Sequence, residues 1–138
     1  MSPKILLIDD SENITSLLSR LLNKYGYEVM IADSGSDGIR LVREQRPDAI
    51  ILDMMMPELD GWQVCKEIRR FSNVPIVVYT GLSDLDTKKS ILAAGANCFL
   101  VKPIPINELV AAVRDTIRQA NRRGPTGGGQ MDIFSQPF

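Results

Sequence analysis

Short apolar segments alternate with longer amphipathic segments along this chain. The strand-like segments are residues 5–8, 28–32, 49–52, 76–79 and 98–101. Between and after them, apolar residues recur at spacings of three and four, which indicates helices that bury one face. These helices are expected at about residues 11–26, 36–46, 60–71, 84–94 and 105–121. The pattern therefore predicts a strand followed by a helix, repeated five times.

The strand segments are apolar on both faces, which is typical of a parallel sheet covered by helices on both sides. Right-handed crossovers then give a doubly wound α/β sandwich with a five-stranded parallel sheet. The commonest strand order for five strands is 2-1-3-4-5, and its switch point lies between the first and third strands. We expect this order, with a crevice at the carboxyl ends of those two strands.

The pattern of apolar residues stops at about residue 121. We therefore expect one domain at residues 1–121 and a Gly/Pro-rich tail or linker at residues 122–138. A flexible tail is the favoured interpretation. The alternatives are a linker to a missing output module and a short docking peptide built on Ile133, Phe134 and Phe138.

Composition narrows the possible functions. The formal net charge is -1, which gives no general reason to bind nucleic acid or an anionic membrane surface directly. No segment approaches the length of a membrane span, and both cysteines fall inside predicted elements, so we expect a cytoplasmic protein. The chain has no histidine, which excludes a Ser-His-Asp triad, a histidine-ligated zinc site and a phosphohistidine donor.

Polar side chains stand directly after four of the strand segments. They are Asp9, Asp10, Asp53, Thr80 and Lys102. The carboxyl ends of parallel strands face one crevice, so these groups are expected to meet there. Converging carboxylates repel one another, and oxygen ligands without histidine or cysteine favour a hard cation. We assign the three acids to Mg²⁺, with the backbone carbonyl of Met55 as a further ligand.

A magnesium site that also holds a lysine and a hydroxyl indicates phosphoryl transfer. Lys102 supplies a positive charge and Thr80 a hydroxyl donor. Asp53 stands alone at the end of a central strand, which makes it the best candidate for a carboxylate nucleophile that forms an acyl phosphate.

Four segments, KILLIDD, AIILDMMMPELDG, VVYTG and FLVKP, resemble the receiver domain of two-component response regulators, over about residues 3–120. The resemblance implies a flavodoxin-like, CheY-like fold, with Asp53 as the phosphorylated residue and Asp9 and Asp10 as metal ligands. It implies that Thr80 and Phe99 are switch residues, that Lys102 senses the phosphoryl group, and that the Lys102–Pro103 bond is cis.

The resemblance also implies partners. A sensor histidine kinase or a histidine phosphotransfer protein would supply the phosphoryl group. The surface of the fourth helix, fifth strand and fifth helix would then change, to control a downstream protein or a missing output domain, with a homodimer through the same surface as a further possibility. Such a chain phosphorylates itself and has weak autophosphatase activity, and it does not turn over an external substrate.

Met55 and Leu82 occupy the positions that tune hydrolysis of the acyl phosphate in this family. Neither side chain can orient a hydrolytic water, so we expect a long-lived phosphorylated state. The alternative is that both fill a partner-binding rim. The basic residues Lys66, Arg69 and Arg70 are expected to form a solvated helix face.

Three other functions stay open at this point. One is a pseudo-receiver that binds proteins without phosphorylation, although the five site residues are intact. A second is a phosphatase with an aspartyl nucleophile, although no second acid follows Asp53 two residues later. The third is a nucleotide-binding domain, although no glycine-rich phosphate loop follows the first strand.

Overall fold

A computed structural model describes residues 2–123 of the chain. Ten elements follow one another in strict alternation: β1 Lys4–Ile8, α1 Glu12–Lys24, β2 Glu28–Ala32, α2 Gly35–Gln45, β3 Ala49–Leu52, α3 Gly61–Arg69, β4 Ile76–Thr80, α4 Leu85–Ala93, β5 Cys98–Val101 and α5 Ile106–Arg123.

The five strands form one parallel sheet in the order β2-β1-β3-β4-β5. Both the doubly wound fold and its strand order are thus confirmed. Strand β1 lies between β2 and β3, with Ile8 opposite Ala32 on one side and Leu52 on the other. The switch point therefore falls between β1 and β3, where the sequence predicted the crevice.

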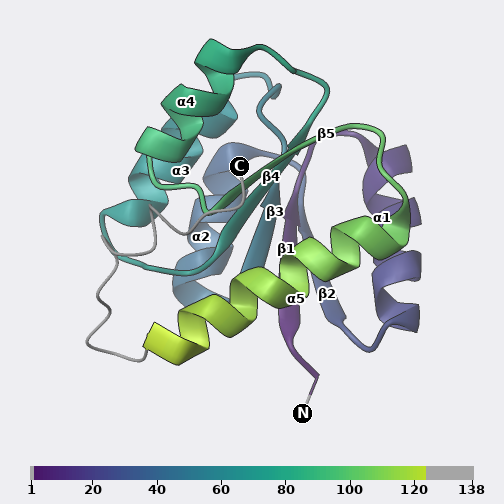
Figure 1. The fold of residues 1–138 in the computed structure, drawn as a ribbon. Helices are drawn as coiled ribbons and strands as arrows, with labels where there is room; N and C mark the ends of the chain where they lie inside the picture. The colour runs from purple at the N-terminus through teal and green to yellow at the C-terminus, as the bar shows by residue number, and fades with distance from the viewer. Residues whose placement is uncertain (1, 124–138) are drawn as a thin grey trace.

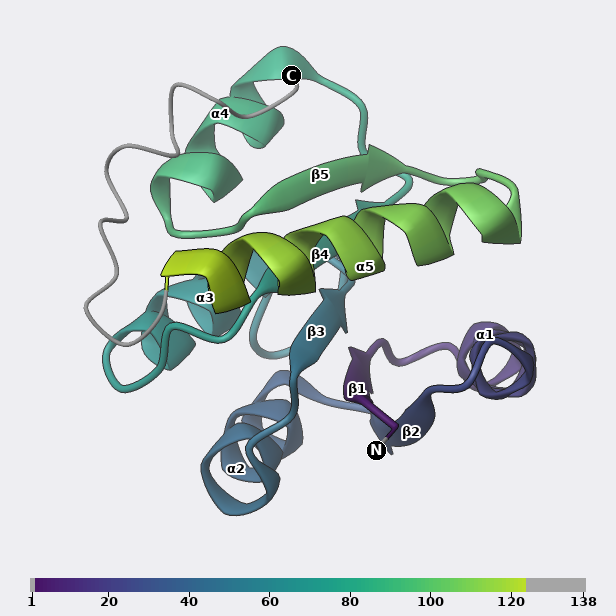
Figure 2. The same cartoon turned by 60° about the horizontal axis from the view of Figure 1, so that its bottom comes forward.

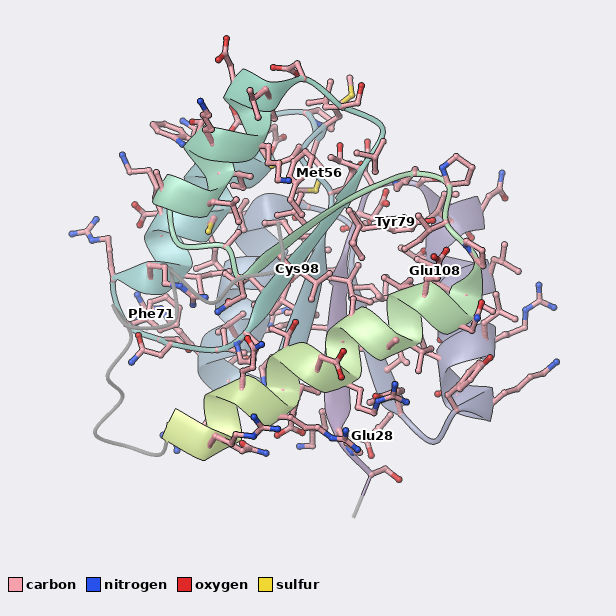
Figure 3. The ribbon with its side chains drawn as sticks, in the orientation of Figure 1. Glu28, Met56, Phe71, Tyr79, Cys98 and Glu108 are labelled. Atoms are coloured by element: carbon pink, nitrogen blue, oxygen red, sulfur yellow. The ribbon has the colours of Figure 1, made fainter. Side chains whose placement is uncertain are left out.

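Helices cover the two faces of the sheet in unequal groups. Helices α1 and α5 lie on one face and α2, α3 and α4 on the other (Figure 1), and the same two groups are seen from below in Figure 2. Each face has its own apolar core, because successive residues of a strand point to opposite faces. In Figure 3, Met56 lies on the side of α3 and α4, whereas Tyr79 lies toward α1.

Local sequence signals set the helix boundaries. The Ser11 side chain accepts a hydrogen bond from the Ile14 N–H and caps α1. Asp60 and Gln63 form a reciprocal capping box at the start of α3, which satisfies backbone donors that have no partner within the helix. Gly26, at a φ of 93°, lies just beyond α1 in the left-handed region that glycine adopts readily.

Two sequence expectations need adjustment. Strand β2 lies at the sheet edge and is not apolar and buried on both faces, since Ile31 is 43% exposed. Helix α5 continues to Arg123, beyond the expected end at residue 121. The rest of the predicted tail, with Ile133, Phe134 and Phe138, lies outside the described residues.

The expected solvated basic face of α3 is only partly correct. Lys66 and Arg70 are exposed, but Arg69 is half-buried and its guanidinium group makes three hydrogen bonds to other parts of the chain. None of the helices between residues 2 and 123 has the length and apolar character that crossing a lipid bilayer requires.

Candidate functional site

The sheet brings the three predicted acids together. Asp9 follows β1, and Asp53 follows the neighbouring strand β3. The Asp53 N–H donates to the Ile8 carbonyl at 3.0 Å, and the Asp9 N–H donates to the Ala32 carbonyl at 3.1 Å. Carboxylate oxygens of Asp9, Asp10 and Asp53 lie within 4.8 Å of one another. The acids therefore form one cluster at the switch point.

The three acids differ in exposure to solvent. Asp9 and Asp53 are buried, at 7% and 8% exposed, whereas Asp10 is exposed. Burial raises the pKa of the Asp53 carboxyl above its ordinary value of 3.8; the Lys102 ammonium opposes this shift and the Asp9 carboxylate adds to it. Hydrogen bonding by the Met55 N–H and the Thr80 hydroxyl lowers the pKa of Asp53 to a smaller extent.

Lys102 supplies the positive charge of the cluster. Its Nζ lies 3.1 Å from Asp9 Oδ2 and 3.9 Å from Asp53 Oδ2, and its side chain is 22% exposed. The same Nζ lies 5.4 Å from the centre of the Tyr79 ring. The Lys102–Pro103 peptide bond is cis. Lys102 is thus placed between the acids and an aromatic wall, where it contacts two of the three carboxylates.

Thr80 is the last residue of β4 and is fully buried. Its backbone carbonyl accepts from the Lys102 N–H at 2.7 Å, which joins the ends of β4 and β5. Its Oγ1 accepts from the Leu82 N–H at 3.4 Å. The hydroxyl group therefore connects the acid cluster with the loop that leads to α4.

The loop after Asp53 places Met55 beside the cluster through its backbone. The Met55 N–H donates to Asp53 Oδ1 at 3.4 Å, while the Met55 side chain is 61% exposed. Met54 and Met56 on either side are buried. Gly61 closes the loop by donating to the Met54 carbonyl at 3.0 Å. The assignment of the Met55 backbone carbonyl as a metal ligand remains a prediction.

The side chains of two predicted residues pack in or against an apolar core. Phe99 is 7% exposed and belongs to the apolar core on the side of α3 and α4. Leu82 is half-buried and packs against the same core. The exposed Met55 and the half-buried Leu82 thus differ in environment, although the sequence suggested one role for both.

Sequence reasoning missed two residues of the site. The Ser11 N–H donates to Asp9 Oδ1 at 2.9 Å, so the residue that caps α1 also holds an acid of the cluster. Tyr79 lies beneath Lys102, and its hydroxyl oxygen accepts from the Ile104 N–H at 3.4 Å. Tyr79 directly precedes Thr80 in the sequence, and this was the signal that could have placed it near the site.

An apolar pocket adjoins the cluster. It has a volume of about 270 Å³ and lies between α1 and the segment that joins β5 to α5. Lys102 and Tyr79 contribute to its wall. The lysine therefore faces both the acid crevice and an apolar surface.

The donor set fits a hard divalent cation. The cluster combines three carboxylates with one nearby ammonium group, so it carries an excess of negative charge. Oxygen ligands at this density are those that Mg²⁺ prefers, commonly together with water and a phosphoryl oxygen. Asp9, Asp10 and Asp53 are the residues that would hold it.

Comparison with known proteins agrees with this arrangement. The response regulator receiver domain family matches residues 5–114. The transcriptional regulatory protein PrrA of Mycobacterium bovis is 42% identical over 135 residues, which are 97% of this chain and 57% of that protein. AfsQ1, a transcriptional regulatory protein of Streptomyces coelicolor, is 41% identical over 120 residues, or 87% of this chain and 53% of that protein.

A solved structure gives the same result. A response regulator receiver domain from Clostridium thermocellum is 33% identical, with a TM-score of 0.82 over 86% of this chain and 97% of that one. The chain spans about half the length of the curated relatives it matches. Because these relatives are named transcriptional regulators, they give no support to the expectation that the protein lacks contact with nucleic acid. The matched segment includes every residue of the acid cluster together with Thr80 and Lys102, and the chain belongs to the response regulator receiver domain family.

Proposed function

We propose that this chain is a phosphorylation-activated switch that accepts a phosphoryl group on Asp53. The observation that carries this proposal is the position of Asp53, a buried carboxylate with Lys102 Nζ 3.9 Å away and two further acids within 4.8 Å. A structural carboxylate gains nothing from such crowding, since neighbouring negative charges destabilise it. A site for a cation and a phosphoryl group accounts for the crowding.

The phosphoryl group comes from a phosphohistidine of a sensor kinase or a histidine phosphotransfer protein. The 138 residues of this chain contain no histidine, so the donor histidine lies outside them. An oxygen of Asp53 attacks phosphorus, an O–P bond forms and the P–N bond breaks, with its electron pair going to the imidazole nitrogen of the donor. Mg²⁺ held by the three acids would neutralise phosphoryl oxygens. Lys102 supplies a further positive charge, because its ammonium group already lies beside Asp53.

Phosphorylation changes the contacts of Thr80. The phosphoryl group adds negative charge and acceptor oxygens beside a hydroxyl that accepts from the Leu82 N–H in the present state. Thr80 moves toward the new acceptors, and Phe99 repacks within its core. Differential stabilisation of a few kcal/mol is enough to reverse a two-state population. The surface formed by α4, β5 and α5 changes as a result.

That surface controls the output. The part of this chain that matches the curated relatives covers about half of their length, which supports an output domain or a separate protein as the receiver of the signal. A homodimer through α4, β5 and α5 is a further form of the same output. The alternative of a pseudo-receiver has less support, because the acids and Lys102 are all present and lie together.

Incubation with acetyl phosphate and Mg²⁺, followed by mass spectrometry, tests the proposal. We expect one phosphoryl group on the native protein and none on Asp53→Asn. The matched control is Asp115→Asn, since the Asp115 carboxylate is 63% exposed on α5. Chelation of Mg²⁺ should prevent incorporation. Equal incorporation into Asp53→Asn would contradict the proposal.

A further inference from the structure

Helix α4 is attached to the domain at its carboxyl end much more firmly than at its amino end. Ile91, near the carboxyl end, is the residue of this helix that is fully buried. Leu85, the first residue of the helix, is 60% exposed. Asp84 caps the helix through Thr87, three residues along the same segment, and this contact does not join α4 to the rest of the molecule.

Arg69 of α3 makes the main polar contact with the carboxyl end. Its Nε donates to the Gly95 carbonyl at 2.9 Å, and its Nη2 donates to Asn97 Oδ1 at 2.9 Å. Its Nη1 donates to the Ser72 carbonyl at 3.1 Å. All three acceptors are neutral, and no carboxylate of residues 2–123 pairs with this guanidinium group. The polar contacts of Arg69 with the α4–β5 turn are therefore hydrogen bonds to neutral acceptors and include no ion pair.

The acceptors of Arg69 are themselves held by the sheet. Asn97 Oδ1 also accepts from the Ile76 N–H at 2.8 Å, and the Asn97 N–H donates to the Ile76 carbonyl at 2.8 Å. Ile76 is the first residue of β4 and is fully buried. The turn after α4 is thus connected both to α3 and to a central strand.

The turn is also shaped around the arginine stem. Gly95 has a φ of +117°, and a Cβ atom built on it would lie 2.6 Å from Arg69 Cγ. Cys65 Sγ lies 3.5 Å from the Ala94 carbonyl and adds a weak contact from the same helix α3. A side chain at position 95 would collide with the arginine stem, and the backbone conformation there also favours glycine.

The amino end of α4 is connected instead to the switch hydroxyl. The Leu82 N–H donates to Thr80 Oγ1 at 3.4 Å, and Asp84 begins the helix two residues later. When Thr80 moves toward a phosphoryl group, the Leu82 N–H loses its acceptor. The loop before α4 is therefore the part that responds, while Arg69 holds the other end of the helix.

We propose that Arg69 is a positioning residue that fixes the carboxyl end of α4, so that phosphorylation displaces the amino end of the helix about this fixed point. The inference rests on the proposed function of Asp53. Within the surface of α4, β5 and α5, it places the largest change of α4 at the segment from Leu82 through the first turns of the helix. A partner that distinguishes the two states then contacts this end of the helix.

Hydrogen exchange of the native protein, with and without beryllofluoride and Mg²⁺, tests the fixed point. We expect exchange of the Leu82 and Thr87 amides to change by about tenfold or more on activation, while the amides of residues 94–96 change by less than about twofold. Equal changes at both ends would overturn the proposal. Because this comparison uses the native protein, it does not depend on the folding of a variant.

Arg69→Met tests the role of the guanidinium group. Without activation, exchange of the amides of residues 94–96 in this variant should be about tenfold faster than in the native protein, because three hydrogen bonds are lost. On activation, exchange at residues 94–96 should then change as much as exchange at the amino end of α4. Arg69→Lys keeps the positive charge and the N–H donors of a single ammonium group, and it should give a smaller rise in exchange at residues 94–96 than Arg69→Met. The matched control is Arg70→Met, because Arg70 is exposed and pairs with Glu67 of the same helix. Native exchange at residues 94–96 in Arg69→Met would overturn the proposal.

The two proposals fail in different ways. Absence of phosphoryl incorporation at Asp53 contradicts the proposed function, whereas the comparison of Arg69→Met with Arg70→Met in the unactivated protein still decides whether Arg69 holds the helix end. Incorporation with equal movement of both ends contradicts only the fixed point.

Discussion

Replacing Asp53 by asparagine should stabilise the protein at neutral pH in the absence of divalent cations. The substitution keeps the side-chain volume and an oxygen that can accept from the Met55 N–H, which lies 3.4 Å from Asp53 Oδ1. It removes one negative charge from a buried position beside two other acids. The native protein therefore carries a destabilising charge that the variant lacks.

The distances give the size of the effect. At an effective dielectric constant of about 20, two like charges no more than 4.8 Å apart repel by at least about 3.5 kcal/mol, and Lys102 at 3.9 Å attracts Asp53 by about 4 kcal/mol. These two contributions nearly cancel, so burial and the second acid, Asp10, decide the sign. We expect the free energy of unfolding of Asp53→Asn to rise by about 1–2 kcal/mol. For a domain of this size that raises the melting temperature by about 3–8 °C.

The pH dependence follows from the raised pKa of Asp53. Below the ordinary value of 3.8, the carboxyl is protonated in both the folded and the unfolded protein, so native protein and variant should be equally stable. As the pH rises above that value, the unfolded chain loses its proton first and the native protein loses stability relative to the variant. The difference becomes constant once the pH exceeds the raised pKa of the folded state.

Thermal unfolding in EDTA across this pH range measures the difference, and Asp115→Asn provides the exposed control, which should lie within about 0.5 kcal/mol of the native protein. Addition of Mg²⁺ should stabilise the native protein more than Asp53→Asn and so reduce the gap. A variant less stable than the native protein at neutral pH, or a gap that does not change with pH, would refute the reasoning.

Two further predictions concern the loop after β3. Met55→Asn should speed loss of the acyl phosphate by about tenfold, because a polar side chain can orient water where the exposed methionine cannot. The decay of labelled phosphoprotein measures this rate. An unchanged rate, or rapid decay of the native protein, would count against a tuning role for Met55. Gly61→Ala should lower the free energy of unfolding, measured in urea, by about 1–3 kcal/mol, because the added Cβ would lie 2.7 Å from the Asp53 carbonyl oxygen. The control is Gly81→Ala, whose added Cβ would have no neighbouring atom within 4 Å. Equal stability of the two variants would show that the loop adjusts freely.

The fold could be predicted from the sequence because its signals are local and repeated. Apolar runs separate strands from helices, and the positions just after the runs place the acids at one sheet edge. The role of Arg69 could not be predicted in this way. From sequence, a charged residue on a helix is expected to face solvent. The acceptors of Arg69, at Gly95 and Asn97, lie 26 and 28 residues away and carry no charge that would identify them as partners.

Other features depended on geometry that no short motif carries. The contact of the Ser11 N–H with Asp9 uses a backbone group, which every residue except proline possesses. Leu82 packs against the apolar core on the side of α3 and α4 whereas the Met55 side chain is exposed, a difference that the sequence did not reveal. The identities of the side chains were thus enough to predict the acid cluster, whereas the contacts that support it could be found only from the folded structure.

Asp9 and Asp53, the two buried acids of the cluster, extend the β ladder at its carboxyl end, since the Asp53 N–H donates to the Ile8 carbonyl and the Asp9 N–H donates to the Ala32 carbonyl. Separating them requires opening the central strands, the part of a domain that opens at a free energy close to that of complete unfolding. The cluster should consequently be as persistent as the folded domain itself. Heat or denaturant would abolish phosphoryl acceptance at the same midpoint at which the sheet melts, with no earlier, separate loss of competence.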